Sequence, residues 1–165
     1  MKLSEFYTLE ECIKADPRYN NMPTEKQIEV IREWCIHIAD PSRRFIGGPL
    51  GAWSVFRNEL YNSSIPGADP HSEHMIKTND SCAGDLDTDI HKVGNNTDLF
   101  WFIYKNCPFN ILIWEFTDEN TGHPKWVHAS HSITRNKKLA LRKSIVGGVT
   151  ITSIYDGQKW VILKK

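Results

Sequence analysis

The chain carries no excess of charge of either sign. Its 165 residues include 20 basic and 20 acidic side chains, so the formal net charge at pH 7 is +0. Domains that bind nucleic acid more often carry a basic excess. A neutral balance also provides no general attraction to an anionic membrane. We therefore expect neither nucleic acid nor a membrane as the partner of this chain.

The sequence also lacks a targeting segment and a membrane-spanning segment. Its first residues, M-K-L-S-E-F-Y-T-L-E-E-C, contain no apolar core of the kind found in secretory signal peptides. No apolar run is long enough to cross a bilayer. These absences predict that the protein stays in the cytoplasm of the cell that makes it, with no insertion into a membrane.

Cysteine is scarce and scattered. The four cysteines form no C-x-x-C pair, and they are Cys12, Cys35, Cys82 and Cys107. In a reducing compartment such residues are free thiols, some of them buried as small apolar side chains. The sequence therefore predicts neither a disulfide framework nor a zinc knuckle built from cysteine.

What is present is typical of one ordinary globular domain. The hydrophobic fraction is 40% and the charged fraction 24%, and 165 residues suffice to bury a substantial core. The clearest helix begins at Pro23-Thr24, where Thr24 and Gln27 form a capping box. Apolar residues then recur at helical spacing, which predicts one buried face. We assign Trp34 to the core and His37 to the helix surface, and we expect Asp40-Pro41 to end the helix.

Strand patterns dominate the second half of the chain. They cover residues 52–56, 111–116, 126–130, 138–142, 149–154 and 160–163, and a helix capped by Asn96 or Thr97 is expected through about residue 105. Residues 111–116 and 126–130 predict an antiparallel hairpin that could bring Glu115 and His128 to one face. Asp156-Gly157 predicts a hairpin turn between the last two strands. The fold class expected is α+β, with a small antiparallel sheet and helices packed on it.

Two segments carry candidate metal ligands. Residues 72–87 place His74 ahead of Asp85, and residues 125–131 (K-W-V-H-A-S-H) supply His128 and His131. Two imidazoles and a carboxylate form a suitable three-ligand set for zinc, with a fourth position for water. Residues three apart on a strand point to opposite faces, so only one of these two histidines can contribute. The polar stretch 68–81 is long for an ordered loop, which indicates a functional or mobile segment.

Several motifs follow one another in a recognisable order. They are Ser54-Val55-Phe56-Arg57, Ser72-Glu73-His74-Met75, Ser81-Cys82-Ala83-Gly84-Asp85-Leu86, Phe109–Phe116 with its L-I-x-E-F ending, Trp126-Val127-His128 and Arg135-Asn136-Lys137-Lys138. With these motifs in this order, the chain resembles the zinc D-Ala-D-Ala carboxypeptidase family, specifically its phage-type peptidoglycan peptidases. The resemblance covers about residues 3–141. Residues 143–165, with the terminal hairpin, lie outside it but within the single domain expected for residues 1–165.

The resemblance implies a function and a set of roles. It implies a fold like that of the Hedgehog and DD-peptidase proteins, and zinc-dependent hydrolysis of peptide bonds in peptidoglycan, with the stem peptide as substrate. Zinc would be held by His74, Asp85 and His128. Glu115 would act as the general base. Arg57 would stabilise the oxyanion or grip a substrate carboxylate, and Ser72 would hydrogen-bond the substrate.

The implied setting is a bacteriophage. The protein would be a lysis enzyme, held in the host cytoplasm until lysis, or a wall hydrolase carried in the virion. One departure motivates an alternative: His74 and Asp85 are eleven residues apart, against the usual seven in the family. A structural or wall-binding virion protein that keeps the fold without turnover therefore stays open. We expect the inserted residues, Lys77–Asp80, to lie at the substrate entrance.

Other readings of the same residues also stay open. Glu115 could be a buried salt-bridge partner, for example of Arg57, because an unpaired buried charge is costly. The alternating Asp85, Asp87 and Asp89 could surround calcium, although the glycine and terminal glutamate of an EF-hand loop are missing. His131 is expected at the surface or behind the ligands. The remaining histidines in polar surroundings are expected to be exposed, and they are His71, His91 and His123.

Overall fold

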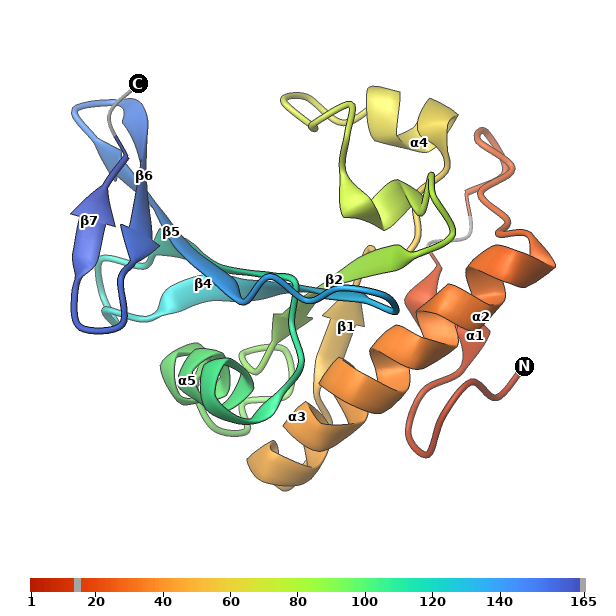
Figure 1. Cartoon of the computed structure of the whole chain (residues 1–165), viewed down its shortest axis with the longest axis horizontal. Coiled ribbons are helices and arrows are strands. Elements are labelled where there is room, and N and C mark those ends of the chain that lie inside the picture. The colour runs from red at the N-terminus through yellow and green to blue at the C-terminus, as the bar shows by residue number, and fades with distance from the viewer. Residues whose placement is uncertain (14–15, 164–165) are drawn as a thin grey trace.

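The computed structural model describes residues 1–13 and 16–163, and its centre is a seven-stranded sheet (Figure 1). The strand order is β1-β2-β4-β3-β5-β6-β7. The strands are β1 (Gly51–Trp53), β2 (Ser81–Asp87), β3 (Ile111–Thr117), β4 (Pro124–Ser132), β5 (Leu139–Val146), β6 (Val149–Tyr155) and β7 (Trp160–Ile162). All neighbours are antiparallel except β3 and β5, which run parallel. The α+β class is confirmed, while the expectation of a purely antiparallel sheet is wrong at this one pair.

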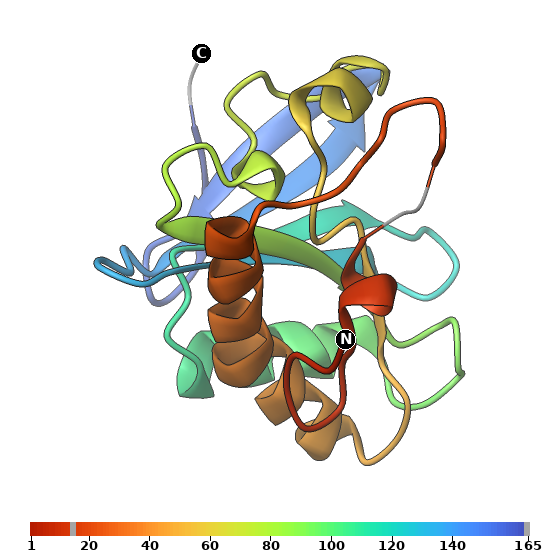
Figure 2. The same cartoon turned by 90° about the vertical axis from the view of Figure 1, so that its right-hand side faces the viewer.

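Helices and loops divide between the two faces of the sheet. The helical elements are α1 (Leu9–Cys12), α2 (Glu25–Trp34), the π-helical η1 (Cys35–Ala39), α3 (Asp40–Ile46), α4 (Glu59–Ser63), the 3-10 turn η2 (Glu73–Met75) and α5 (Asn96–Asn106). The continuous run α2-η1-α3 lies with α5 on one face (Figure 1). In Figure 2, the segment that carries α4 and η2 lies over the opposite face. The second face is therefore covered by loops rather than by long helices.

The longest helical run does not end where the sequence suggested. Its start agrees with the prediction, because the Thr24 side chain accepts a hydrogen bond from the Gln27 backbone. The expected end at Asp40-Pro41 is wrong, because α3 continues through both residues. A proline ring normally crowds the carbonyl four residues earlier in a helix. Here the wider π-helical turn η1 directly precedes Pro41, and an irregular turn of this kind accommodates the ring without breaking the helix.

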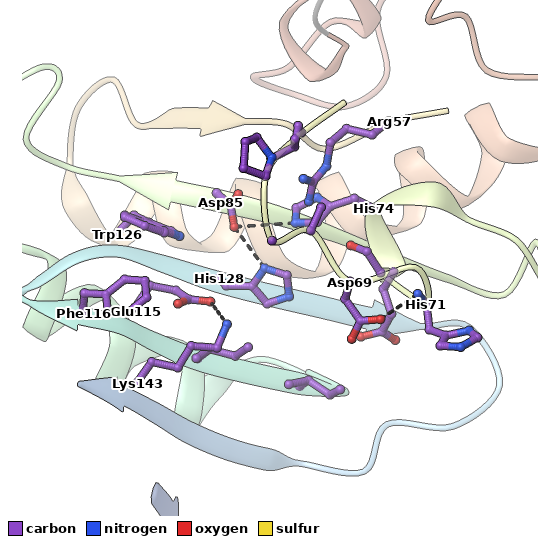
Figure 3. Close-up of a pocket in the computed structure, with 18 residues that line it drawn as sticks. Arg57, Asp69, His71, His74, Asp85, Glu115, Phe116, Trp126, His128 and Lys143 are labelled. Carbon is purple, nitrogen blue, oxygen red and sulfur yellow. Dashed lines mark hydrogen bonds and ion pairs between the residues drawn. The ribbon is translucent and has the colours of Figure 1, made fainter. Parts of the chain in front are cut away.

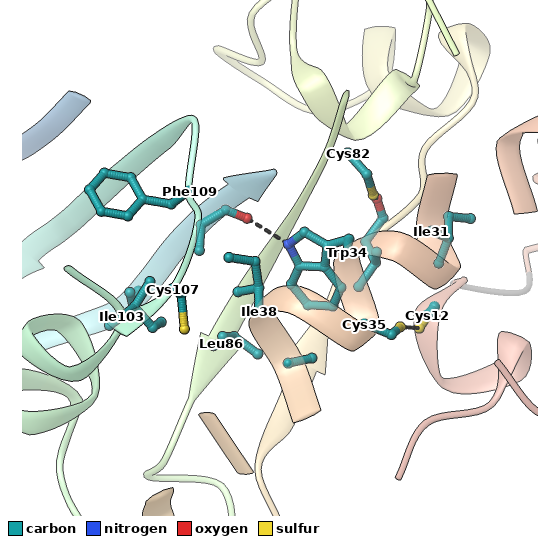
Figure 4. Close-up of a cluster of buried hydrophobic side chains, with 14 of the residues drawn as sticks. Cys12, Ile31, Trp34, Cys35, Ile38, Cys82, Leu86, Ile103, Cys107 and Phe109 are labelled. Atoms are coloured by element: carbon teal, nitrogen blue, oxygen red, sulfur yellow. Dashed lines mark hydrogen bonds between the residues drawn. The ribbon is translucent and has the colours of Figure 1, made fainter. Parts of the chain in front are cut away.

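Trp34 attaches this helical run to the sheet (Figure 4). Its side chain is completely buried, as predicted, and its Nε1 donates a hydrogen bond to the Ala129 carbonyl on β4 at 2.8 Å. The indole lies directly over Gly84 on β2, where a side chain would collide with the ring. All four cysteines are buried as free thiols on this side of the sheet or beside it. The close approach of Trp34 requires glycine at position 84.

The start of α5 differs by one residue from the prediction. Asn95 is the N-cap, and its side chain accepts a hydrogen bond from the Asp98 backbone at 2.8 Å. Asn96 is buried instead and donates to the carbonyls of Pro124 and Lys125. Asn96 therefore does not cap the helix. Its side chain connects the loop after β2 to the start of β4.

The terminal strands belong to the same sheet as the rest. β5 pairs with β3, and β6 and β7 follow as a meander with a turn at Asp156-Gly157, as predicted. Lys164 and Lys165, at the end of the expected hairpin, lie outside the described residues. None of the described helices is long and apolar enough to cross a bilayer.

The contact between Trp34 and Gly84 generates a stability prediction. Gly84→Ala should lower the free energy of unfolding by about 1–3 kcal/mol, because the added methyl group would overpack the site. The measurement is urea denaturation followed by circular dichroism. In a Trp34→Phe background the same substitution should cost less, since the smaller ring leaves space for the methyl group. An equal cost in both backgrounds would show that the indole is not the obstacle.

Candidate metal centre

The pairing of β2 with β4 brings two of the proposed ligands together. Asp85 lies opposite His128 in this register, so both side chains are on the loop-covered face of the sheet. His128 Nδ1 is 3.0 Å from Asp85 Oδ1. His74 comes from η2, and its Nε2 is 3.7 Å from the same oxygen (Figure 3). Three residues from distant parts of the sequence therefore converge on one point.

These three side chains form a group that could hold a metal ion. One ligand atom from each lies within 4.8 Å of the other two. In a tetrahedral site with bonds of about 2.0–2.1 Å, neighbouring ligand atoms are about 3.3–3.4 Å apart. The two distances at Asp85 Oδ1, 3.0 and 3.7 Å, fall on either side of that value. Small movements of the side chains would complete three corners of a tetrahedron.

The electrostatic environment keeps the group in a form that can bind metal. Complete burial lowers the pKa of His74 to about 3; Asp85 opposes this effect, while the nearby His128 and Arg57 add to it. Burial acts to raise the pKa of Asp85, but His74, His128 and Arg57 outweigh it, so the pKa is held below its ordinary value. The result is a neutral imidazole beside a carboxylate. Metal ions require these deprotonated forms.

Arg57 provides a positive charge close to the candidate ligands. Its backbone N–H donates to the His74 carbonyl at 3.0 Å, which fastens η2 to the chain that follows β1. The side chain points toward the His74 ring (Figure 3). Burial lowers the pKa of the guanidinium, and Asp85 opposes this effect. An arginine keeps its charge in proteins, so Arg57 offers a fixed positive charge next to the candidate ligands.

Glu115 lies on the same face, but its partner is not the one suggested by the sequence. The antiparallel β3–β4 register places Ile113 opposite His128, so Glu115 occupies the next position on that face. Lys143 lies opposite Glu115 in the parallel β3–β5 pair, and its Nζ donates to Glu115 Oε1 at 2.9 Å. The idea of an Arg57 partner is therefore wrong. Glu115 Oε2 is buried and has no hydrogen-bond partner among the described residues.

Lys143 is the site residue that sequence reasoning missed. It lies outside the segment that resembles a known family, and a parallel neighbour for β3 was not expected. The available signal was the lone carboxylate in the apolar run of Ile111–Phe116, which required a cation from somewhere in the fold. The structure supplies that cation from the first of the three C-terminal strands.

These side chains line a cleft with a volume of about 580 Å³. One wall consists of Ile65–Asp69 together with His71 and Ser72, and Phe116 and Trp126 also line the cleft. The two aromatic rings lie 5.8 Å apart between their centroids. Lys77–Asp80 do not line the cleft, so their expected place at its entrance is wrong. That segment instead turns toward the end of β4, where Asp80 accepts a hydrogen bond from Ser132 Oγ.

The other histidines separate as follows. His131 points to the helix-covered face and is only 5% exposed, so it lies neither at the surface nor behind the candidate ligands, and both expected positions are wrong. His71 and His91 are exposed, as predicted, but His123 is half-buried, with Nδ1 2.8 Å from Thr97 Oγ1.

Of the acidic series proposed for calcium, Asp87 accepts hydrogen bonds from Asn96 and the Asp89 backbone. No described group of possible ligands includes Asp87 or Asp89.

Comparisons with known proteins add no further assignment. No family model, no curated protein and no solved structure matches this chain.

The Glu115–Lys143 pair generates the next prediction. Lys143→Met should lower the free energy of unfolding by about 1–3 kcal/mol, because it removes the partner of a buried carboxylate. Lys143→Arg should retain most of the stability, since it keeps a donor cation. Lys125 is an exposed lysine on β4, the strand on the other side of β3. Lys125→Met should change stability by less than about 0.5 kcal/mol. Thermal and urea unfolding would measure all three, and equal stability of both methionine variants would refute the role of Lys143.

Proposed function

We propose that this chain is a zinc metallopeptidase that hydrolyses peptide bonds in bacterial peptidoglycan. In this proposal it has the fold of the Hedgehog and DD-peptidase proteins and is related to the phage-type D-Ala-D-Ala carboxypeptidases. It would serve a bacteriophage as a lysis enzyme or as a virion-associated hydrolase. The stem peptide of the wall would be its substrate.

One observation carries the proposal. The residues to which the resemblance gives chemical roles come from five separate segments, and all of them line one cleft: Arg57, Ser72, His74, Asp85, Glu115 and His128. If the sequence resemblance were accidental, these side chains would not be expected to line the same cleft. The surroundings of His74 and Asp85 also keep these two candidate ligands in the forms that bind metal.

The donor set suits zinc. Two histidine nitrogens and one carboxylate oxygen are a ligand set found in catalytic zinc sites, where a fourth position is left for water or substrate. When bound, zinc supplies Lewis acidity that activates water near neutral pH and polarises a carbonyl. His74, Asp85 and His128 would hold it at the floor of the cleft.

Glu115 would act as the general base. The residue lines the same cleft as the ligands; its Oε1 accepts a hydrogen bond from Lys143, while Oε2 has no hydrogen-bond partner among the described residues. Oε2 is therefore the atom that would take the proton from the attacking water and pass it to the leaving amine. Lys143 fixes the direction of the carboxylate without occupying this oxygen.

Arg57 and Ser72 would orient the substrate. The half-buried guanidinium of Arg57 can stabilise the negative charge that develops on the carbonyl oxygen, or bind a carboxylate of the peptide. Ser72 also lines the cleft and lies directly before η2. Its hydroxyl can donate to or accept from a peptide group.

The direct test is incubation of the zinc-loaded protein with purified peptidoglycan, followed by mass analysis of what is released. Release of free D-alanine would identify a carboxypeptidase, and release of peptide fragments an endopeptidase. Zinc bound without any cleavage would overturn the proposed activity and favour the wall-binding alternative.

Replacing the base should separate catalysis from metal binding. Glu115→Gln should retain zinc and lose about 10²–10⁴-fold in turnover, because it removes the proton acceptor but no ligand. Glu119 is exposed and lies outside the cleft, so Glu119→Gln should keep the activity of the unaltered protein. A fully active Glu115→Gln variant would show that Glu115 is structural.

Replacing a ligand should remove metal. After treatment with a chelator and reloading, His128→Ala should bind one zinc ion fewer per chain than the unaltered protein, as measured by elemental analysis. His71 also lines the cleft but is exposed and is not among the proposed ligands, so His71→Ala should bind the full amount. Undiminished zinc in the His128→Ala variant would refute the ligand assignment.

A further inference from the structure

A second group of potential ligands lies on the opposite face of the sheet. It consists of Glu33 near the end of α2, His37 in the π-helical turn η1, and His131 on β4. One ligand atom from each lies within 4.8 Å of the other two. Because His128 and His131 are three residues apart on β4, the same strand contributes a histidine to each face.

His131 is held in the form of a metal ligand. Its ring is 5% exposed, and Nδ1 lies 2.7 Å from the Pro108 carbonyl oxygen. A carbonyl only accepts hydrogen bonds, so Nδ1 must carry the proton, and Nε2 keeps its lone pair in the neutral ring. Nε2 forms no hydrogen bond with the described residues. Histidines that bind metal characteristically donate their other N–H to a backbone carbonyl in this way.

His37 and Glu33 complete the group from the helix. Glu33 Oε2 is 3.3 Å from His37 Nε2, which equals the spacing of about 3.3 Å between neighbouring ligands in a tetrahedral zinc site. The His37 and His131 rings face each other with centroids 4.8 Å apart and an angle of 31° between their planes. The Glu33 and His37 side chains are 40% and 43% exposed, so an ion can reach them from solvent.

A purely structural explanation accounts for only part of this arrangement. A glutamate and a histidine four residues apart on a helix form a weak surface pair in many proteins. That pair does not explain why a buried imidazole from the sheet faces His37. Two imidazoles beside one carboxylate form a donor set that suits a divalent transition-metal ion.

We propose that Glu33, His37 and His131 form a second metal site, which takes a divalent transition-metal ion such as zinc. The three ligands leave a fourth position open to solvent. An ion here joins α2 and η1 directly to β4, beside the contact that Trp34 makes with the same strand. Its expected effect is to stabilise the packing of the helical run on the sheet. The site shares no ligand with His74, Asp85 and His128 and does not depend on the proposed peptidase activity.

The test is to count bound zinc and measure its affinity by competition with a coloured chelator. The unaltered protein should bind two zinc ions per chain, His128→Ala one, and the double variant His37→Ala/His128→Ala none. Glu33→Gln should weaken the second site about tenfold or more, since even the loss of a supporting hydrogen bond to a ligand costs about 10–100-fold in affinity. His91 is an exposed histidine away from both groups, so His91→Ala should bind as the unaltered protein does.

Thermal unfolding provides a second measurement on the same variants. Zinc should raise the melting temperature of His128→Ala but not of His37→Ala/His128→Ala, whereas the zinc-free melting temperatures of the two should be alike because the His37 side chain is only half-buried. Undiminished zinc in His37→Ala, or no zinc in His128→Ala, would overturn the second site. If the first site alone is wrong, zinc will be lost on replacing His37 and retained on replacing His128.

Discussion

The antiparallel pairing of β2 with β4 is the constraint on which the rest of the structure depends. On one face it places Asp85 opposite His128, and on the other it places Gly84 opposite Ala129. The first pair forms the floor of the cleft, and the second provides the flat surface on which Trp34 lies. A shift of one residue would move every side chain of a strand to the other face. The core contact and the candidate metal centre therefore require the same register.

The cleft is completed by strands from beyond the β3–β4 hairpin. β5 adds to the sheet parallel to β3, and this brings Lys143 beside Glu115. One carboxylate oxygen of Glu115 is thus hydrogen-bonded, and the other has no partner among the described residues. The loop-covered face holds the cleft, while the helix-covered face is filled by the core. This division explains how a small domain can hold a buried, charged site without exposing its core.

Much of the local structure could be predicted from the sequence. The hairpin of β3 and β4, the capping box at Thr24, the burial of Trp34 and the turn at Asp156-Gly157 all depend on neighbouring residues. The three candidate ligands could be named because the order of short motifs, rather than any single one, pointed to them. Their convergence on one point is a finding of the structure; that they bind zinc stays a proposal.

The features that could not be predicted depend on contacts between distant segments. Lys143 meets Glu115 only because β5 pairs with β3 rather than with β4. Pro41 is accommodated by an irregular turn whose width no local pattern specifies. The burial of His131 follows from the helical run packing on that face of β4, and the turn of Lys77–Asp80 toward Ser132 follows from the Asp80 hydrogen bond. In each case the deciding partner lies far away in the sequence.

The most direct test of the central claim is a crystal structure of the zinc-loaded protein with anomalous scattering recorded at the zinc absorption edge. The account predicts an anomalous peak bonded to His74 Nε2, Asp85 Oδ1 and His128 Nδ1, with its open side toward Glu115. No peak between these three atoms at full zinc loading would contradict it.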